Sequence, residues 1–108
     1  MELFRPVGQN GLALIEQSGF KAFPPRLPEQ PIFYPVLNEK YAIEIASKWN
    51  TKGGKIGNVT QFIVSDAYIS TYDVHTVGAS YHQEYWIPAE ELERFNKNIV
   101  GLIEIIYI

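Results

Sequence analysis

The chain has 108 residues, of which 46% are hydrophobic and 19% charged, and this balance predicts one globular domain over residues 1–108 and excludes a disordered chain. The net charge of −3, with Lys and Arg scattered along the sequence, argues against a surface that binds nucleic acid, and no run of about 18 apolar residues predicts a membrane span. The absence of cysteine excludes disulfides and thiolate metal sites, and without a basic and then apolar leader we expect a cytoplasmic protein.

The first third of the chain predicts a strand, a helix and a long loop. Apolar and polar residues alternate over 2–7, which is typical of a strand. A short helix is expected over 10–19, with Asn10 as its cap and Gly19 at its end. Residues 20–31 hold four of the seven prolines and therefore form an irregular loop. Such a long loop either lines a functional site or is a rigid strap over one end of the core.

The middle of the chain contains the clearest helix. β-Branched and aromatic residues predict a strand over 32–37. A helix follows over 38–50, capped by Asn38 and with an apolar face that includes Ala42 and Ala46. Two alanines on this face indicate a close approach to a sheet.

The second half predicts a series of short elements. The glycine-rich turn over 51–58 lacks the spacing of a phosphate-binding loop. The strand over 102–108 is apolar at nearly every position, so we expect it to be buried on both faces or central in its sheet. The remaining elements are strands over 59–65, 73–78 and 84–88, one or two helical turns over 66–72, and a helix over 89–98.

This order of elements predicts the fold class. Strands and helices alternate without a repeated βαβ unit, which favours α+β over a doubly wound fold. We therefore expect a small split sheet, mixed or antiparallel, with three short helices.

Two side chains in the first half are candidates for ligand binding. Arg5 lies in an apolar strand, where its planar fork suits a phosphate or carboxylate ligand, or where it faces solvent and pairs with a nearby Glu. Tyr34 lies mid-strand beside Phe33, and one of these two faces the core while the other faces outward or into a cleft.

Glu84 and His82 are the candidates in the second half. Glu84 opens the strand "EYWIP" and is either an ordinary solvent-facing residue or a charge at the lip of a cleft. His82 lies two positions earlier and could form an acid–base pair or a hydrogen bond with Glu84. His75 and His82 lack metal-ligand spacing, so no metal site is predicted. Ser80 is not in a strained elbow, which argues against a serine hydrolase.

Three segments resemble the ADP-ribosyltransferase superfamily: "ELFRP", "IFYPVLNEKYAIEIA" and "QEYWIP". Nearly the whole chain also resembles small uncharacterised bacterial proteins labelled "ADP-ribosylation/crystallin J1", through "FPPRLP", "FYPVLN" and "WIPAEEL". The resemblance implies an ADP-ribosyltransferase-like fold that uses NAD as substrate. It implies that Arg5 holds the dinucleotide, that Tyr34 stacks on nicotinamide, and that Glu84 is the catalytic carboxylate; His82 is expected among the cofactor-binding residues.

Two functional hypotheses follow from the sequence. The first is an ADP-ribosyltransferase or NAD glycohydrolase whose acceptor is unknown, and it requires Arg5, Tyr34 and Glu84 to meet in one cleft with the loop 20–31 as a wall. The second is a non-catalytic module that binds a nucleotide or a protein on a related scaffold. The second is favoured if Arg5 and Glu84 neutralise each other or lie on opposite faces.

Overall fold

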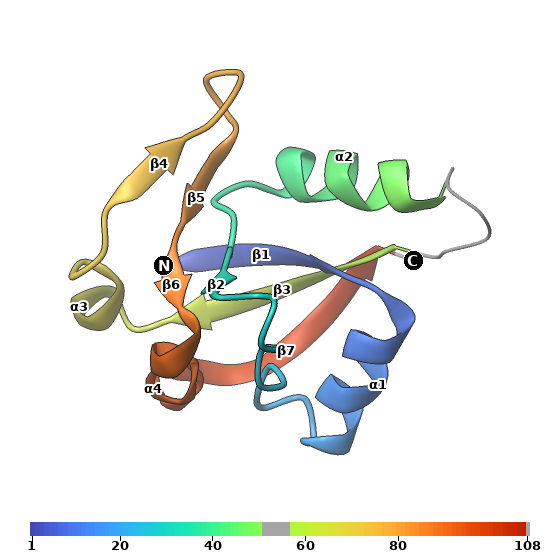
Figure 1. Ribbon diagram of the computed structural model, residues 1–108, viewed down its shortest axis with the longest axis vertical. Coiled ribbons are helices and arrows are strands. Elements are labelled where there is room, and N and C mark those ends of the chain that lie inside the picture. The colour runs from blue at the N-terminus through green and yellow to red at the C-terminus, as the bar shows by residue number, and fades with distance from the viewer. Residues whose placement is uncertain (51–56, 108) are drawn as a thin grey trace.

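The computed structural model describes residues 1–50 and 57–107, so the turn predicted over 51–58 lies mostly outside the described residues. The elements along the chain are β1 (Glu2–Val7), α1 (Gln9–Gln17), β2 (Ile32–Phe33), α2 (Glu39–Asn50), β3 (Asn58–Val64), α3 (Asp66–Ile69), β4 (Val74–Thr76), β5 (Gln83–Tyr85), β6 (Ile87–Pro88), a 3-10 helix η1 (Ala89–Glu91), α4 (Leu92–Lys97) and β7 (Ile99–Tyr107) (Figure 1).

The strands form small antiparallel sheets, and the predicted α+β class is confirmed. β3 is the middle strand of a three-stranded sheet in the order β1-β3-β7, while β2 pairs with β6 and β4 pairs with β5. The described residues form four α-helices, which are the three expected helices and the short α3. α3 confirms the helical turns predicted over 66–72, and it begins where the Ser65 side chain accepts a hydrogen bond from the backbone N–H of Tyr68.

A single residue, Val36, links the main sheet to the β4–β5 hairpin. Isolated antiparallel bridges join Phe4 to Val36 and Val36 to Glu84. Phe4 and Val36 exchange two backbone hydrogen bonds of 2.9 and 2.8 Å, and the Pro35 carbonyl accepts one from β5 at 3.0 Å. Pro35 itself has no N–H to donate, so the strand predicted over 32–37 is reduced to β2 and this bridge.

Helix α2 covers one face of the main sheet at very close range. Ala42 and Ala46 are fully buried against the sheet, which confirms the predicted close approach. A Cβ atom at Gly57 would lie only 2.5 Å from the carbonyl oxygen of Ala46. Only glycine therefore fits at this position, directly before β3, without a shift of the backbone. The predicted cap is also confirmed, because the Asn38 side-chain oxygen accepts a 2.8 Å hydrogen bond from Tyr41 N–H.

The other face of the sheet packs on aromatic rings that also fix the long loop. Phe23, from the loop 20–31, is buried between Phe33 and Phe62, with ring centroids 5.1 and 4.8 Å away. The Asn96 side chain from α4 bonds both the N–H and the carbonyl of Phe23, at 2.9 and 3.0 Å. The first part of the loop is therefore held to the core, as the strap interpretation predicts, whereas Leu27 further along is exposed.

Two expectations about the chain's ends need correction. The strand predicted over 102–108 is neither central nor buried on both faces, because β3 occupies the middle position and Val100 and Leu102 of β7 are more than half exposed. Helix α1 starts after Gly8, with no side-chain cap, and Asn10 lies inside it. Among the described residues, no helix has both the length and the apolar character needed to cross a bilayer.

Candidate functional site

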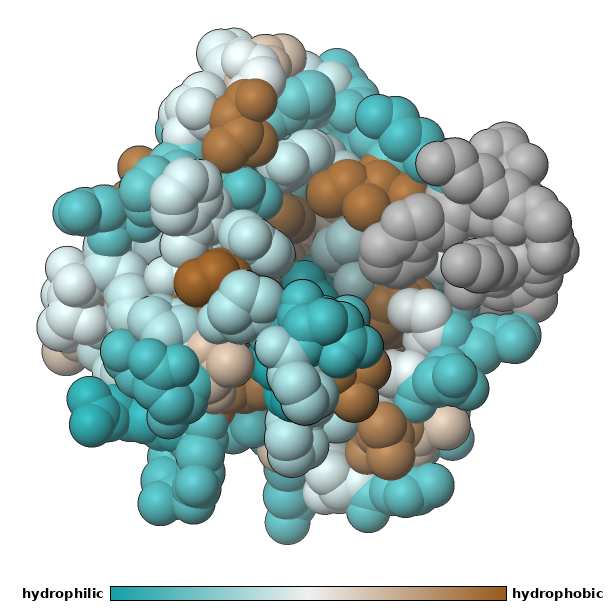
Figure 2. All heavy atoms as spheres, in the orientation of Figure 1, coloured by the Kyte–Doolittle hydropathy of each residue, from teal (hydrophilic) through white to brown (hydrophobic). Residues whose placement is uncertain are grey.

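A cleft of about 530 Å³ brings together Arg5, Tyr34 and Glu84, which lie far apart in the sequence. Arg5 comes from β1, Tyr34 follows β2, and Glu84 lies in β5. The hollow below α2 in Figure 2 has hydrophilic and hydrophobic surface around it. The full lining of the cleft is Arg5, Pro6, Arg26, Gln30, Tyr34, Val36, Ile45, Glu84 and Trp86.

Strand alternation explains why two aromatic side chains face this cleft. Phe33 of β2 lies opposite Ile87 of β6, and both are buried in the core. The next pair in the same register is Tyr34 and Trp86, whose side chains point to the other face. Tyr34 is 39% exposed and Trp86 is 42% exposed, so two large aromatic rings lie open beside the cleft. Such rings can contact a planar ligand.

The Glu84 carboxylate is held in place by two donors. The indole N–H of Trp86 donates to Oε1 of Glu84 at 3.0 Å, and the hydroxyl of Tyr41 donates to Oε2 at 3.4 Å. The indole is itself fixed by stacking on His75, with centroids 3.6 Å apart and ring planes 4° from parallel. Burial, followed by the nearby Glu84 charge, raises the pKa of Tyr41, so this hydroxyl remains a donor at neutral pH.

Arg5 is a partly buried cation without a carboxylate partner in the described part of the chain. Its Nη1 donates to the Tyr34 carbonyl at 3.1 Å, and the guanidinium lies 4.5 Å from the centre of the Phe33 ring. Within residues 1–50 and 57–107, no carboxylate forms an ion pair with it. Burial and the nearby charge of Arg26 lower the pKa of Arg5 to about 9, against an opposing effect of Glu84. Arg5 and Glu84 thus share a cleft without neutralising each other.

Arg26 and Gln30 come from the loop 20–31, and these two residues form one wall of the cleft. The Nη2 of Arg26 donates to the Ile32 carbonyl at 3.1 Å, whereas its Nε is buried and has no hydrogen-bond partner in the described part of the chain. The guanidinium lies 5.9 Å from the centre of the Phe33 ring, which Arg5 also contacts. A second cation therefore stands beside Arg5, and it too has no acidic partner among the described side chains.

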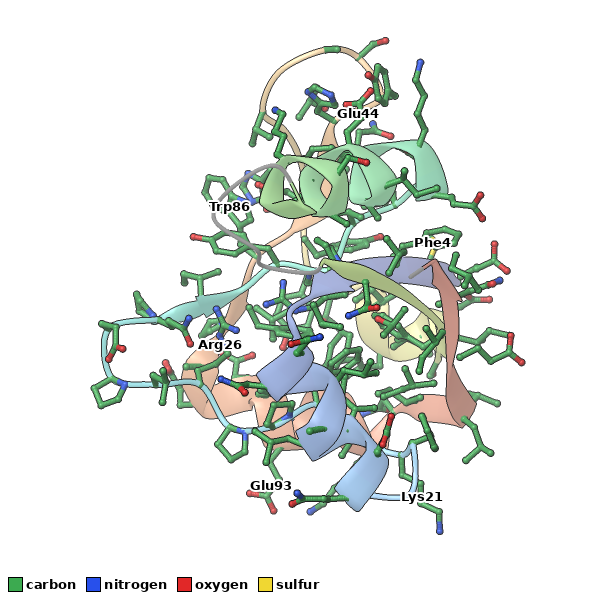
Figure 3. The ribbon with its side chains drawn as sticks, turned by 90° about the vertical axis from the view of Figure 1, so that its right-hand side faces the viewer. Phe4, Lys21, Arg26, Glu44, Trp86 and Glu93 are labelled. Carbon is green, nitrogen blue, oxygen red and sulfur yellow. The ribbon has the colours of Figure 1, made fainter. Side chains whose placement is uncertain are left out.

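His82 is placed away from the cleft lining, in contacts of its own. Its Nε2 lies 3.1 Å from Oε2 of Glu44, its Nδ1 accepts from Ala79 N–H at 3.1 Å, and its ring stacks on Tyr41 at 4.5 Å. β5 begins one residue after His82, so strand alternation does not bring it to the face of Glu84. Figure 3 shows Glu44 on α2, well away from Arg26, while Trp86 and Arg26 lie on the same side of the molecule.

Three residues that contact Glu84 or stand beside Arg5 were not predicted from the sequence as part of the site. Trp86 had a usable signal, since a residue two positions from Glu84 on one strand shares its face. The sequence signal for Arg26 was weaker, and consisted only of a charged residue in the long loop. Tyr41 had none, because its contact with Glu84 depends on how α2 lies against β5.

The arrangement as a whole can hold a planar ring and an anion next to a carboxylate. The two guanidinium groups suit phosphate oxygens, and the aromatic pair suits a flat heterocycle. Among the described residues, no group of three His, Asp or Glu side chains is placed to hold a metal ion. Comparison of the chain with protein-family models, with curated proteins and with solved structures finds no match.

Proposed function

We propose that this protein is an NAD-dependent ADP-ribosyltransferase or NAD glycohydrolase on an ADP-ribosyltransferase-like fold. The observation that carries the proposal is the convergence of Arg5, Tyr34 and Glu84 on one cleft. These are the residues that the resemblance to the superfamily assigns to dinucleotide binding, nicotinamide stacking and catalysis.

Each side chain has a role that matches its surroundings. Arg5 carries an unpaired positive charge for the pyrophosphate of NAD. Tyr34, with Trp86 opposite, offers an open aromatic surface for the nicotinamide ring. Glu84 lies in the same cleft, held by its two donors, where its carboxylate can accept hydrogen bonds from the nicotinamide ribose.

The reaction breaks the bond between the ribose C1 atom and the nicotinamide nitrogen. The bonding electrons leave with nicotinamide, which becomes neutral, and positive charge develops on the sugar. The Glu84 carboxylate stabilises this charge, and the fixed orientation of the carboxylate means that it need not reorganise during the reaction. Water or an acceptor group then adds to C1 and loses a proton, which completes the balance with ADP-ribose or an ADP-ribosylated acceptor as product.

One observation supports a second function, a nucleotide-binding module without catalysis. Both carboxylate oxygens of Glu84 already accept a hydrogen bond from Trp86 or Tyr41. A carboxylate satisfied in this way can be structural, and the cleft would then bind a nucleotide without cleaving it. Binding without nicotinamide release separates this function from the first.

The decisive experiment measures nicotinamide release from NAD by the wild type and by Glu84→Gln. The substitution preserves the shape of the side chain and removes its charge. We expect release to fall by about 100-fold or more, as for other groups that stabilise transition-state charge. Binding of NAD, followed by calorimetry, should change far less.

Glu90→Gln is the matched control, since Glu90 is exposed in η1 and does not line the cleft. It should release nicotinamide at the wild-type rate. Equal release by wild type and Glu84→Gln would rule out the catalytic role of Glu84. NAD binding without any release by the wild type would support the binding module instead.

A further inference from the structure

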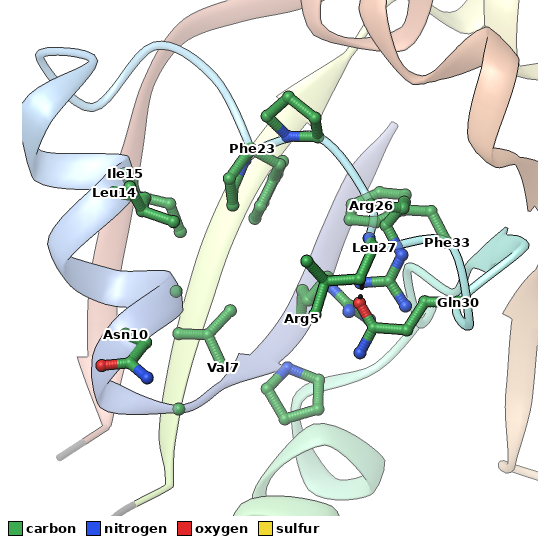
Figure 4. Close-up of a pocket in the computed structure, with 15 residues that line it drawn as sticks. Arg5, Val7, Asn10, Leu14, Ile15, Phe23, Arg26, Leu27, Gln30 and Phe33 are labelled. Carbon is green, nitrogen blue, oxygen red and sulfur yellow. Dashed lines mark hydrogen bonds between the residues drawn. The ribbon is translucent and has the colours of Figure 1, made fainter.

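A second cavity, of about 460 Å³, adjoins the cleft and shares its two arginines (Figure 4). The two hollows have four lining residues in common: Arg5, Pro6, Arg26 and Gln30. Beyond them, the second cavity is lined by α1 on one side and by the loop 20–31 on the other, as Figure 4 shows for Leu14 and Leu27. The pair therefore forms one elongated site with a positively charged middle.

The two guanidinium groups at the junction have unused binding capacity. Arg5 donates to one backbone carbonyl and Arg26 to another, at 3.1 Å each. Each guanidinium has five N–H donors, and one hydrogen bond is present on each, so donors beyond these remain without a protein partner among the described residues, although the Nε of Arg26 is buried. The charge of Arg26 contributes to the lowering of the pKa of Arg5, which means that the two cations repel each other. A ligand with two negative charges would relieve this repulsion.

We propose that Arg26 completes, with Arg5, a site for the two linked phosphates of a dinucleotide, and that the second cavity holds its adenosine end. This inference rests on the proposed function, because the glycosidic bond to be cleaved would then lie on the Glu84 side of the arginine pair. It adds Arg26 and the loop 20–31 to the binding site, and it sets the direction in which the ligand lies.

The character of the second cavity supports an adenosine. Its walls are mainly apolar, with Phe23 and Ile15 buried below and Leu14 and Leu27 exposed at the rim. The side-chain amides of Asn10 and Gln30 contribute polar atoms to the walls. Predominantly apolar walls with a few polar groups, at this volume, are typical of sites for flat heterocyclic ligands.

The test compares the binding of ADP-ribose and of inorganic pyrophosphate by calorimetry. In Arg26→Gln, both probes should bind about 10- to 100-fold more weakly, as expected for loss of hydrogen bonds to a charged group. Arg26→Lys keeps the charge and should retain most of the pyrophosphate affinity. Arg94→Gln is the matched control, because Arg94 is exposed on α4 and lines neither hollow.

A second variant tests the adenosine position. Leu14→Trp narrows the second cavity from its exposed rim, so ADP-ribose should bind at least about tenfold more weakly while pyrophosphate binds as in the wild type. Ala13→Trp is the control, since Ala13 is also exposed on α1 but does not line the cavity. Circular dichroism of each variant establishes that it is folded.

The possible results separate this inference from the proposed function. Wild-type affinity for both probes in Arg26→Gln would overturn the phosphate site, and wild-type ADP-ribose affinity in Leu14→Trp would overturn the adenosine position. A wild type that binds neither probe overturns both parts. If Arg26→Gln weakens binding but the wild type releases no nicotinamide, the inference stands and the catalytic proposal fails. If Arg26→Gln cleaves NAD with unchanged kcat and KM, the catalytic proposal stands and the phosphate-binding role of Arg26 fails.

Discussion

The arginine pair and the cluster around Glu44 both contain charged and aromatic groups, yet their hydrogen bonding differs sharply. At the end of the β4–β5 hairpin, Glu44 accepts hydrogen bonds from the Tyr81 hydroxyl and from His82, and both ring nitrogens of His82 have partners. At the junction of the two hollows, Arg5 and Arg26 have two carbonyl partners between them and no carboxylate in the described residues.

This difference indicates which polar groups serve the fold and which serve a ligand. Buried polar groups in folded proteins are normally paired, because an unpaired one costs free energy. The Glu44 cluster satisfies its own requirements and joins α2 to the hairpin. The arginine pair does not, and under our proposal this cost is tolerated because the pair binds a ligand. The sequence predicted both Arg5 and His82 as binding residues, and the structure separates them by position and by partners, because Arg5 lines the cleft and His82 does not.

The largest expected effect is that of Arg5→Met. We expect the affinity for ADP-ribose to fall by about 100-fold, because a partly buried cation that would contact the phosphates is lost. The ligand-free protein should become more stable, by about 1 kcal/mol, because the variant no longer buries an unpaired charge. Since the pKa of Arg5 is lowered to about 9 in the folded protein, the cost is present at neutral pH and disappears only above that value.

Calorimetry and thermal unfolding at pH 7 measure the two effects, with Arg94→Met as the exposed control. A variant that binds ADP-ribose normally would remove Arg5 from the site. A lower midpoint of unfolding would mean that the contacts of Arg5 with Phe33 and Tyr34 outweigh its desolvation.

A smaller effect is expected for Trp86→Phe, which keeps an aromatic ring in the cleft but removes the N–H that bonds Glu84. As Trp86 positions the carboxylate, kcat for nicotinamide release should fall about tenfold with KM little changed. Steady-state kinetics with NAD measure both. A rise in KM at constant kcat would instead assign Trp86 to substrate binding.

The smallest effect on the ligand is expected for Glu44→Gln, which should leave ADP-ribose affinity unchanged. Hydrogen bonds from Tyr81 and then from His82 lower the pKa of Glu44 below its ordinary value of 4.5. Its contribution to stability is thus fully present above that value and is lost as the pH falls through the folded-state pKa. Thermal unfolding between pH 7 and pH 3 should show a weaker acid dependence in the variant. A loss of ADP-ribose affinity in Glu44→Gln would show that the Glu44 cluster also contributes to ligand binding, contrary to this comparison.

Local rules predicted much of the fold. Asn38 could be placed as a cap because an amide side chain before an apolar helical pattern satisfies the first backbone donors, and Ala42 and Ala46 indicated the close approach of α2. The position of β7 could not be predicted, because an apolar run does not specify which strand becomes its neighbour.

The residues of the candidate site also divide into those that local sequence rules predict and those that depend on tertiary contacts. Tyr34 and Glu84 face the cleft because of strand alternation, which sequence reasoning can apply once the strands are identified. Arg26 and Tyr41 reach the site through tertiary contacts, the first through the anchoring of Phe23 to Asn96 and the second through the placement of α2. No local pattern encodes such contacts.

The bridge at Val36 has a consequence for which ligands the protein can accept. Arg5 follows Phe4 directly, and Phe4 and Glu84 both pair with Val36. The distance between the backbones of Arg5 and Glu84 is therefore set by main-chain pairing, and the hydrogen bonds of Arg5 to the Tyr34 carbonyl and of Glu84 to Trp86 and Tyr41 restrain the two side chains. Under the proposed function, such a span would select substrates by the separation between their negative group and their sugar.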